Sequence, residues 1–417
     1  MKSFKNSGIE WIGDIPNDWD VKAAFQIFSQ VKNKNEGLTE TNLLSLSYGK
    51  IKRKNIDTVG GLLPESFDGY NIIESGDIVL RLTDLQNDQT SLRVGLSEER
   101  GIVTSAYLTL RNQSGNFTKY LYYYLHTFDI CKGFYGMGAG VRQGLNWEGL
   151  KLLKITLPPM CEQHRIVDFL DSECARIDAV IEQTRASIEE YKKLKQSVIT
   201  EAVTKGIRGD RPMKDSGIEW IGEIPDDWEP IKFKHMASVK SNLVDPAEYG
   251  DYIQVSPENI EKGSGRLLPC KTVSEVGVIS GNHLFFKDQI LYSKIRPKLN
   301  KVTIAPFVGL CSADMYPIET SQNVKFVLYA MLSDVLLAQV SMITEDRVKM
   351  PKINQDELGN TWFAKPLINE QAEIVAFLDQ RCKELDELID AKIQLLSELE
   401  AYKKSVIYEY VTGKKEV

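Results

Sequence analysis

The sequence has few of the residues that build metal-binding or reactive sites. It contains six cysteines and four histidines, and the cysteines form no CxxC pair and no spacing typical of zinc ligands. Reduced thiols and no metal site are therefore expected. The histidines form no HExxH pattern, which argues against a zinc hydrolase. His126 and His164 fall in segments with helical patterns, where a packing or surface role is expected.

Motifs that bind nucleotides or a methylated base are also lacking. There is no Walker A sequence, which argues against ATP binding by a P-loop. The glycine-rich stretch 136–140 does not fit GxGxxG, and a loop is expected there. The stretch 157–160 (LPPM) superficially resembles the (N/D)PP(Y/F) loop of amino-methyltransferases. It lacks the Asn or Asp that holds the target amine and the aromatic residue that stacks on the flipped base, so no catalytic residue is predicted.

No apolar run is long enough to cross a membrane. The longest, 326–340, is interrupted by Ser333 and Asp334 and is shorter than the roughly 20 residues that a spanning helix needs. The first residues show no apolar signal segment, so a cytoplasmic protein without a membrane partner is expected. The hydrophobic content of 42% and charged content of 26% are ordinary, so the chain can bury a core in each of several domains.

The chain also lacks an excess of positive charge, since its formal net charge is −7. Basic and acidic residues are nearly balanced within residues 20–155 and within residues 229–365. The acidity therefore lies in the remaining segments. Any DNA-binding surface must be a local patch inside one of the two balanced segments, because binding phosphate requires concentrated positive charge.

The sequence does contain an internal repeat. The stretch 7–19 (SGIEWIGDIPNDW) returns at 216–228 (SGIEWIGEIPDDW). A second phrase, with Glu-Gln, Ile-Val, Phe-Leu-Asp, Cys and Asp at matching positions, begins at Glu162 and again at Glu370. Two copies of one half-molecule, with similar connecting parts and different bodies between them, indicate one geometry that is applied to two different targets.

The repeat divides the chain into segments. These are a motif at 1–19, a body at 20–155, a helical segment at 156–206, a linker with the second motif at 207–228, a body at 229–365 and a helical segment at 366–417. Both bodies combine short strand-like runs, such as 103–110, with helices predicted over 119–128 and 324–337. The expected fold is α+β with a mostly strand core. The same order of elements with different side chains predicts one scaffold with two loop sets, and loops usually carry specificity.

Each helical segment carries an apolar stripe with steps of three and four residues, which predicts a single helix of about 40 residues. Because a lone helix would leave this stripe exposed, we expect the two helices to form an antiparallel coiled coil that separates the bodies. The alternative is that each helix caps its own body. The tryptophans and isoleucines of the motifs are expected to pack onto the helices. The predicted seam residues are Ile166, Leu170, Ile177, Ile181, Ile188, Tyr191, Ile374, Leu378, Leu385, Ile389, Leu396 and Leu399.

Basic residues form clusters in both bodies. Arginine and lysine suit phosphates and guanine edges, and glutamine or asparagine can pair with adenine. A solvated charged face is the alternative for any single residue. The DNA-binding candidates are Lys50, Lys52, Arg53, Lys54, Arg81, Arg142, Gln143, Asn259, Lys294, Arg296, Lys298, Asn300, Arg347 and Lys349.

Together these features resemble the DNA-specificity subunit of type I restriction-modification systems. The resemblance is carried by SGIEWIGxIPxxW, by the LPP…EQ…IVxFLD passage at 157–171 with its second copy at 366–379, and by the alternation of variable bodies with repeated helices. The resemblance covers essentially the whole chain. The second copy of the LPP passage departs from the first at Leu367, which stands where the first copy has Pro159. The resemblance implies that residues 20–155 and 229–365 are target-recognition domains, each reading one half of a bipartite site on double-stranded DNA.

The resemblance also assigns the chemistry to partner proteins. The helices would fix the unread spacer and dock two modification subunits, which carry S-adenosylmethionine and methylate adenine N6. Restriction subunits would supply DNA translocation and cleavage with ATP and Mg²⁺, so this chain would be non-catalytic and hold no cofactor. Two other classes remain open. One is a coiled-coil scaffold without DNA contact, and the other is a self-sufficient methyltransferase or nuclease, against which the absence of a cofactor loop and of a carboxylate cluster argues.

Overall fold

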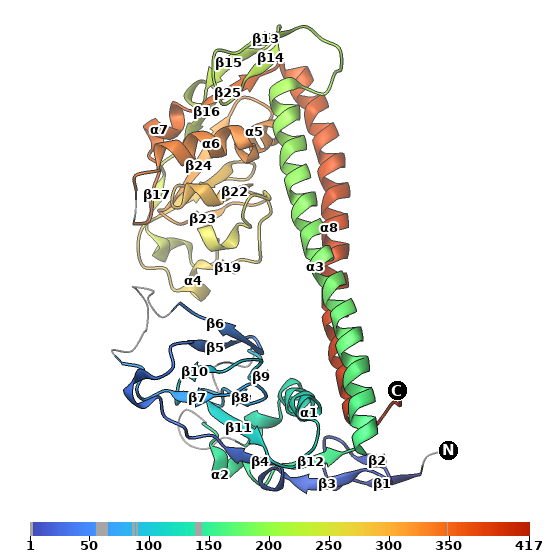
Figure 1. The fold of residues 1–417 in the computed structure, drawn as a ribbon. Helices are drawn as coiled ribbons and strands as arrows, with labels where there is room; N and C mark the ends of the chain where they lie inside the picture. The colour runs from blue at the N-terminus through green and yellow to red at the C-terminus, as the bar shows by residue number, and fades with distance from the viewer. Residues whose placement is uncertain (1–2, 56–65, 86–87, 89–90, 138–143, 348) are drawn as a thin grey trace. The chain divides into compact units, whose positions relative to one another are not determined.

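The chain folds into two compact units, as seen in a computed structural model that describes residues 3–55, 66–85, 88, 91–137, 144–347 and 349–417 (Figure 1). The first unit comprises Met1–Thr184 with Leu395–Val417, and the second comprises Arg185–Gln394. Each unit contains one repeated motif, one domain of mixed helices and strands, and part of both long helices. The predicted α+β fold with an internal repeat is confirmed.

The domain of the first unit is built on a four-stranded antiparallel sheet with the order β4-β11-β8-β9. Two smaller ribbons, β5–β6 and β7–β10, lie beside it, and β3 pairs with β12 where the domain begins and ends. The strands are β1 (Phe4–Asn6), β2 (Asp14–Pro16), β3 (Asp20–Ala23), β4 (Phe28–Gln30), β5 (Leu44–Ser47), β6 (Lys50–Arg53), β7 (Asn71–Ile73), β8 (Ile78–Leu80), β9 (Val94–Leu96), β10 (Gly101–Val103), β11 (Leu108–Asn112) and β12 (Lys154–Leu157). The short helices are η1 (Ala24–Gln26), η2 (Glu36–Leu38), α1 (Thr118–Ile130), η3 (Gly133–Gly136) and α2 (Trp147–Leu150).

The domain of the second unit repeats this plan, with a sheet of order β16-β24-β21-β22 and with β15 paired to β25. Where the first unit has the ribbons β5–β6 and β7–β10, it has one five-stranded sheet of order β17-β20-β23-β18-β19, in which β20 pairs with β23 as β7 pairs with β10. The strands are β13 (Met213–Asp215), β14 (Glu223–Pro225), β15 (Glu229–Lys232), β16 (Ala237–Val239), β17 (Leu243–Val244), β18 (Ile253–Val255), β19 (Lys271–Thr272), β20 (Asn282–Phe285), β21 (Ile290–Ser293), β22 (Val302–Ile304), β23 (Gly309–Cys311), β24 (Met315–Thr320) and β25 (Trp362–Lys365). The short helices are η4 (Phe233–His235), η5 (Pro246–Tyr249), η6 (Pro257–Asn259), α4 (Val273–Val276), η7 (Pro297–Leu299), α5 (Val324–Leu332), α6 (Asp334–Ile343) and α7 (Gln355–Gly359).

Two predicted elements are wrong in their bounds. The helix predicted over 324–337 is two helices, α5 and α6, that meet at a bend of 57°. The break lies at Ser333, whose backbone is extended (ψ 160°) and whose hydroxyl donates to the Ala330 carbonyl. The strand-like run 103–110 holds the end of β10 and the start of β11, which are separated by a turn.

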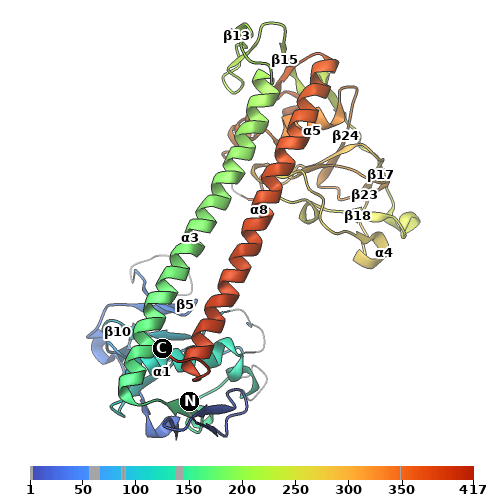
Figure 2. The ribbon, with the colours of Figure 1, turned by 90° about the vertical axis from the view of Figure 1, so that its right-hand side faces the viewer.

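The two long helices, α3 (Met160–Lys205) and α8 (Ile368–Val411), are continuous across the boundary between the units. In the first unit Phe169 packs on Tyr410 with ring centroids 4.3 Å apart, and Lys403 pairs with Asp178 at 2.6 Å. In the second unit Lys195 pairs with Asp386 at 2.7 Å. Because residue numbers rise along α3 where they fall along α8, the pair is antiparallel (Figure 2), as predicted.

The predicted seam residues are turned away from solvent. Ile177 and Ile181 of α3 and Leu385 and Ile389 of α8 are buried, and the seam residues nearer the domains also join the domain cores. Both interpretations of the helical segments are therefore correct in part. At its start each helix packs on its own domain, and past that domain it pairs with the other long helix. The other buried seam residues are Ile166, Leu170, Ile188, Ile374 and Leu378, and the half-buried ones are Tyr191, Leu396 and Leu399.

The repeated motifs fasten each domain to the start of its helix. The indole Nε1 of Trp19 donates to Glu162 Oε2 at 3.3 Å, and Trp228 Nε1 donates to Glu370 Oε2 at 2.9 Å. Both tryptophans are fully buried. Since a buried indole N–H requires an acceptor, the tryptophan and the glutamate of the repeated phrases form one unit of structure. The predicted packing role of the motifs is confirmed.

A left-handed glycine follows each long helix and lies against the tryptophan of a motif. Gly206 has φ +77°, and a Cβ added to it would lie 3.3 Å from Trp228 Cζ2. Gly413 has φ +72°, and an added Cβ would lie 2.7 Å from Pro16 Cδ and 3.1 Å from Trp19. Only glycine fits this combination of backbone and space. Each motif is thus completed by the end of a long helix, α3 in the second unit and α8 in the first.

The bent pair α5 and α6 and the His126 side chain pack inside the protein. Among the described residues, no single helix is long and apolar enough to cross a membrane. The bent pair α5 and α6 has the length and the apolar composition of a membrane span only when the two helices are taken together. That pair contributes Phe326, Met331 and Leu336 to the core of the second unit. His126 is buried in α1, where burial, and then Lys403, lower the pKa of its imidazole to about 4. It is therefore neutral at pH 7 and has the packing role that was expected.

Candidate nucleic-acid interface

Two basic loops meet in the second unit. The loop between β21 and β22 and the loop before α7 are joined by backbone hydrogen bonds from Arg296 N to Pro351 O at 2.7 Å and from Ile353 N to Lys294 O at 2.9 Å. We call residues 294–301 and 349–353 the basic loop pair. It joins the segment around Arg296 to the segment around Pro351, although the two lie far apart in the sequence.

The backbone of the basic loop pair is strained. Arg296, Asn300 and Met350 have positive φ angles of 47°, 43° and 46°. Residues other than glycine adopt positive φ angles at a cost of about 1–3 kcal/mol each, and residues strained in this way concentrate at functional sites. Hydrogen bonds hold the strained loop in place, since Lys301 Nζ donates to Pro257 O at 2.6 Å and Thr303 Oγ1 donates to Gly265 O at 2.8 Å.

The charges of the loop pair divide into paired and open groups. Arg347 donates to Glu357, which lowers the pKa of that carboxyl, and Lys352 pairs with Asp314 at 3.0 Å. Lys294 is half-buried, with its ammonium 5.4 Å from the centre of the Tyr316 ring. The side chains of Arg296, Lys298 and Lys349 are exposed, and no ion pair holds them among the residues that the structure describes. These three charges are open to phosphate.

The asparagines proposed to pair with adenine are used within the fold. Asn259 Oδ1 accepts from Ser256 N at 2.9 Å, and its Nδ2 donates to Pro269 O at 3.0 Å. Asn300 is buried, and its Nδ2 donates to Leu332 O at 3.3 Å. Both amides therefore stabilise loops, and this geometry favours a structural role over base recognition.

The first unit carries its candidates on a ribbon and on loops. Lys50 and Lys52 are exposed on β6, Lys54 follows it and is exposed, and Arg53 pairs with Glu99. Arg81 is half-buried and lies 3.6 Å from Asp88. Arg142 and Gln143 lie outside the described residues. Leu145 N donates to Leu82 O at 2.9 Å, which repeats the bond between Ile353 and Lys294, so the same two loops meet in both units.

A buried arginine that sequence analysis missed supports the first-unit loops. The Arg93 guanidinium donates to the carbonyls of Arg81 and Thr83, each at 3.0 Å, and its backbone N–H donates to Asp129 Oδ2 at 2.6 Å. Burial raises the pKa of the Asp129 carboxyl to about 6. Nothing in the local sequence distinguishes Arg93 from a surface arginine, because its burial is created only by the folded loop.

Comparison with known proteins decides the family. The profile of the type I restriction modification DNA specificity domain matches residues 16–190 and again residues 225–399. The chain belongs to this family. Its two matches each cover one domain with the first part of the helix that follows, and the resemblance seen in the sequence is confirmed. The family recognises DNA within type I restriction-modification systems and is non-catalytic.

Individual relatives support the assignment over different lengths. The chain is 34% identical over 247 residues to the type I restriction enzyme EcoDI specificity subunit of Escherichia coli, and this alignment covers 55% of the chain and about half (54%) of that subunit. It is 24% identical over 430 residues to the putative type I restriction enzyme MjaX specificity subunit of Methanocaldococcus jannaschii, covering 97% and 95%. A solved structure concerned with complex assembly and conformational transition of the type I R-M system contains a chain with a TM-score of 0.70, 14% identity and coverage of 96% and 99%. At that identity the likeness shows the fold.

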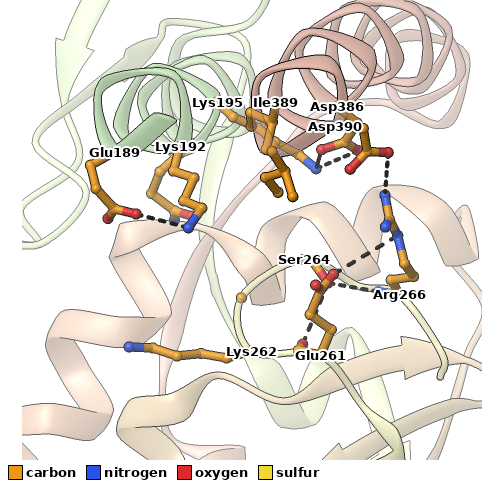
Figure 3. A pocket seen from close by; sticks show the side chains of 13 residues that line it. Glu189, Lys192, Lys195, Glu261, Lys262, Ser264, Arg266, Asp386, Ile389 and Asp390 are labelled. Atoms are coloured by element: carbon orange, nitrogen blue, oxygen red, sulfur yellow. Dashed lines mark hydrogen bonds and ion pairs between the residues drawn. The ribbon is translucent and has the colours of Figure 1, made fainter. Parts of the chain in front are cut away.

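The second specificity domain also touches the long helices around a cavity of about 460 Å³ (Figure 3). Arg266 from the domain lies 3.8 Å from Glu261 and 3.9 Å from Asp390 of α8. Lys195 and Asp386, from the two helices, form the ion pair at its upper wall. Because Lys192, Lys195 and Arg266 each pair with an acidic side chain, this cavity offers no concentrated charge for phosphate. The described residues contain no group able to hold a metal ion.

Proposed function

We propose that this chain is the subunit that recognises a bipartite site on double-stranded DNA, with each specificity domain reading one half of the site. The observation that carries the proposal is the strained basic loop pair, which exposes Arg296, Lys298 and Lys349 without acidic partners among the described residues. The equivalent loops meet in the first unit with different side chains. One scaffold with two loop sets suits two different half-sites.

The long helices are proposed to fix the unread spacer and to dock two modification subunits. Support comes from their continuity across both units and from exposed apolar side chains on α8, which include Phe377, Leu388 and Ile393. A partner that packs on this helix would bury these apolar groups, which favours binding. The modification subunits would supply S-adenosylmethionine and adenine N6-methylation, and restriction subunits would supply ATP- and Mg²⁺-dependent cleavage. This chain would hold no cofactor and would act with its partners in the cytoplasm.

Splitting recognition between two domains has an energetic advantage. Each mismatched base pair typically costs about 1–3 kcal/mol, and these costs add for separate positions. A fixed distance between the domains then rejects sites whose halves are correct but wrongly spaced. Specificity therefore comes from two sets of base contacts and from the gap between them.

Domain exchange tests the proposal directly. Residues 229–365 would be replaced by the equivalent domain of another family member, and N6-methyladenine would be mapped across a genome that carries the chimera and its modification subunits. We expect the second half of the methylated site to change while the first half and the gap stay the same. An unchanged site would instead favour a scaffold that does not read DNA, and adenine methylation by the purified chain alone would contradict the non-catalytic assignment.

Removing the open charges of the basic loop pair should weaken binding without changing sequence preference. In the variant Arg296→Ala, Lys298→Ala, Lys349→Ala, we expect the slope of log K against log salt for DNA binding by the complex to fall by about 3, since each phosphate contact contributes roughly 0.9. Titrations of labelled duplex at several salt concentrations measure this slope.

The matched control removes the same charge from the other end of the sheet. The basic loop pair follows the end of β21. Lys240 and Lys287 instead lie beside the start of β21, and Lys234 precedes β16 of the same sheet. The variant Lys234→Ala, Lys240→Ala, Lys287→Ala should keep the original slope. If both variants lower the slope equally, net charge and not the loop pair governs binding.

A further inference from the structure

The strands β5 and β6 form a two-stranded ribbon with an unusual tip. Ser47 pairs with Lys50 across a two-residue turn made of Tyr48 and Gly49. Both turn residues have positive φ angles, 47° and 75°, as a type I′ hairpin turn requires. Asparagine, aspartate and glycine are the residues that favour the first position of this turn, and this chain has a tyrosine there.

The inner face of the ribbon is fixed to the sheet. Leu44 and Leu46 are buried, and a Cβ added to Gly95 of β9 would lie 2.6 Å from Leu46 Cδ1 and 3.0 Å from Ile51 Cδ1. At the tip, a Cβ added to Gly49 would lie 3.1 Å from Leu92 Cβ. The ribbon therefore packs directly on β9, and its position is set by close contacts along its whole length.

The outer face of the ribbon is polar and basic. Side chains alternate along paired strands, so Ser45 and Ser47 share this face with their cross-strand partners Lys52 and Lys50. Both lysines are exposed. Arg53 pairs across from Leu44 and is held by Glu99, so it braces the base of the ribbon. The outer face thus offers hydroxyl and ammonium donors on a narrow, rigid surface.

Burial does little to stabilise the side chain of Tyr48. Its side chain is 75% exposed, although its backbone is in the left-handed region that bulky residues rarely adopt. Among the described residues other than glycine that have positive φ, it is the aromatic one. Strain at an exposed aromatic side chain is not compensated by burial. Such a residue is typical of a contact that is completed by a partner.

We propose that the β5–β6 ribbon enters the major groove of the first half-site and that Tyr48 contributes to its sequence specificity. This inference rests on the proposed function and assigns one element to one half of the site. The major groove, about 12 Å wide, admits a two-stranded ribbon. There the Tyr48 ring meets thymine methyl groups or base edges, its hydroxyl bonds to base acceptors, and Lys50 and Lys52 bond to phosphates or to guanine.

The substitution Tyr48→Asn separates recognition from folding. Asparagine tolerates a positive φ and is favoured in this turn, so the melting temperature should stay the same or rise. The complex with modification subunits would be assayed on a library of duplexes with both halves of the site randomised. We expect preference at one or two positions of the first half-site to relax by roughly tenfold, the scale of a lost base contact, while the second half-site, read by the other unit, is unchanged.

The control is a second exposed aromatic residue of the same unit. Phe25 lies in η1 and is 54% exposed, and Phe25→Asn should leave both half-sites unchanged. If the wild-type complex selects a bipartite site and Tyr48→Asn selects the same one, the ribbon proposal is overturned. Equal loss of affinity for all duplexes would also overturn it, because the contact would then be to the backbone. A wild-type complex without any bipartite preference would instead overturn the proposed function.

Discussion

A heptad inserted into both long helices, after Thr184 in α3 and after Gln394 in α8, should lengthen the preferred gap between the half-sites by about three base pairs. Seven residues add about 10.5 Å of helix, and one base pair occupies about 3.4 Å. A full heptad preserves the apolar stripe, so the antiparallel seam can continue through the insertion. Methylation of a library with graded gaps would show loss of the original spacing and selection of a longer one.

Two further insertions test whether the helices set the gap. A heptad in α3 alone shifts its seam against α8 and separates paired groups such as Lys195 and Asp386, so we expect loss of specific recognition at every gap. Seven residues inserted after Gly277, in an exposed turn that follows α4, should leave the gap unchanged. A double insertion that retains the original gap would show that the spacing is determined elsewhere.

Replacing Trp228 by alanine should lower the free energy of unfolding by about 3–5 kcal/mol, the range for removing a buried large aromatic side chain. Trp228 is fully buried, donates to Glu370 and lies with its ring 5.6 Å from the Arg211 guanidinium. Its loss leaves a cavity where the second motif, the end of α3 and the start of α8 meet. Chemical denaturation followed by far-ultraviolet circular dichroism measures the change.

Two substitutions separate the contributions of Trp228. Trp228→Phe keeps an aromatic ring but removes the hydrogen bond to the Glu370 carboxylate, so a smaller loss of about 1.5–3 kcal/mol is expected. Trp220→Ala, in the same motif but only half-buried, should cost less than Trp228→Ala. Hydrogen exchange should show lost protection in the second unit. Equal costs for the two alanine variants would mean that the motif does not depend on its buried tryptophan.

The elements that sequence analysis predicted well are those governed by periodicity. The apolar stripe that begins at Ile166 specifies one face of α3 over its whole length, and the seam residues are buried or half-buried accordingly. The bend between α5 and α6 was missed because Ser333 is compatible with a helix, and its extended backbone depends on the fold around it. Periodicity describes a helix face but does not show where tertiary packing interrupts a helix.

The candidate interface was predictable in composition but not in arrangement. Arg296 and Lys349 both stand among the predicted DNA-binding residues, but the sequence does not show that their loops are joined by backbone hydrogen bonds. Asn259 and Asn300 were given a binding role from residue type alone, whereas the fold uses their amides. Tyr48 was not singled out, because a backbone angle leaves no mark in the sequence when the residue is not glycine.

The end of α8 completes the core of the first unit, and this affects the order in which the two units fold during synthesis. Val406, Ile407 and Val411 belong to the core that also contains Ile12 and Trp19. Domains generally fold as units during translation, the amino-terminal one first, but here the first unit lacks part of its interior until the end of α8 has been made. The second unit has no such delay, since the residues that complete it are contiguous in the chain. The later half of the polypeptide can therefore finish folding before the earlier half.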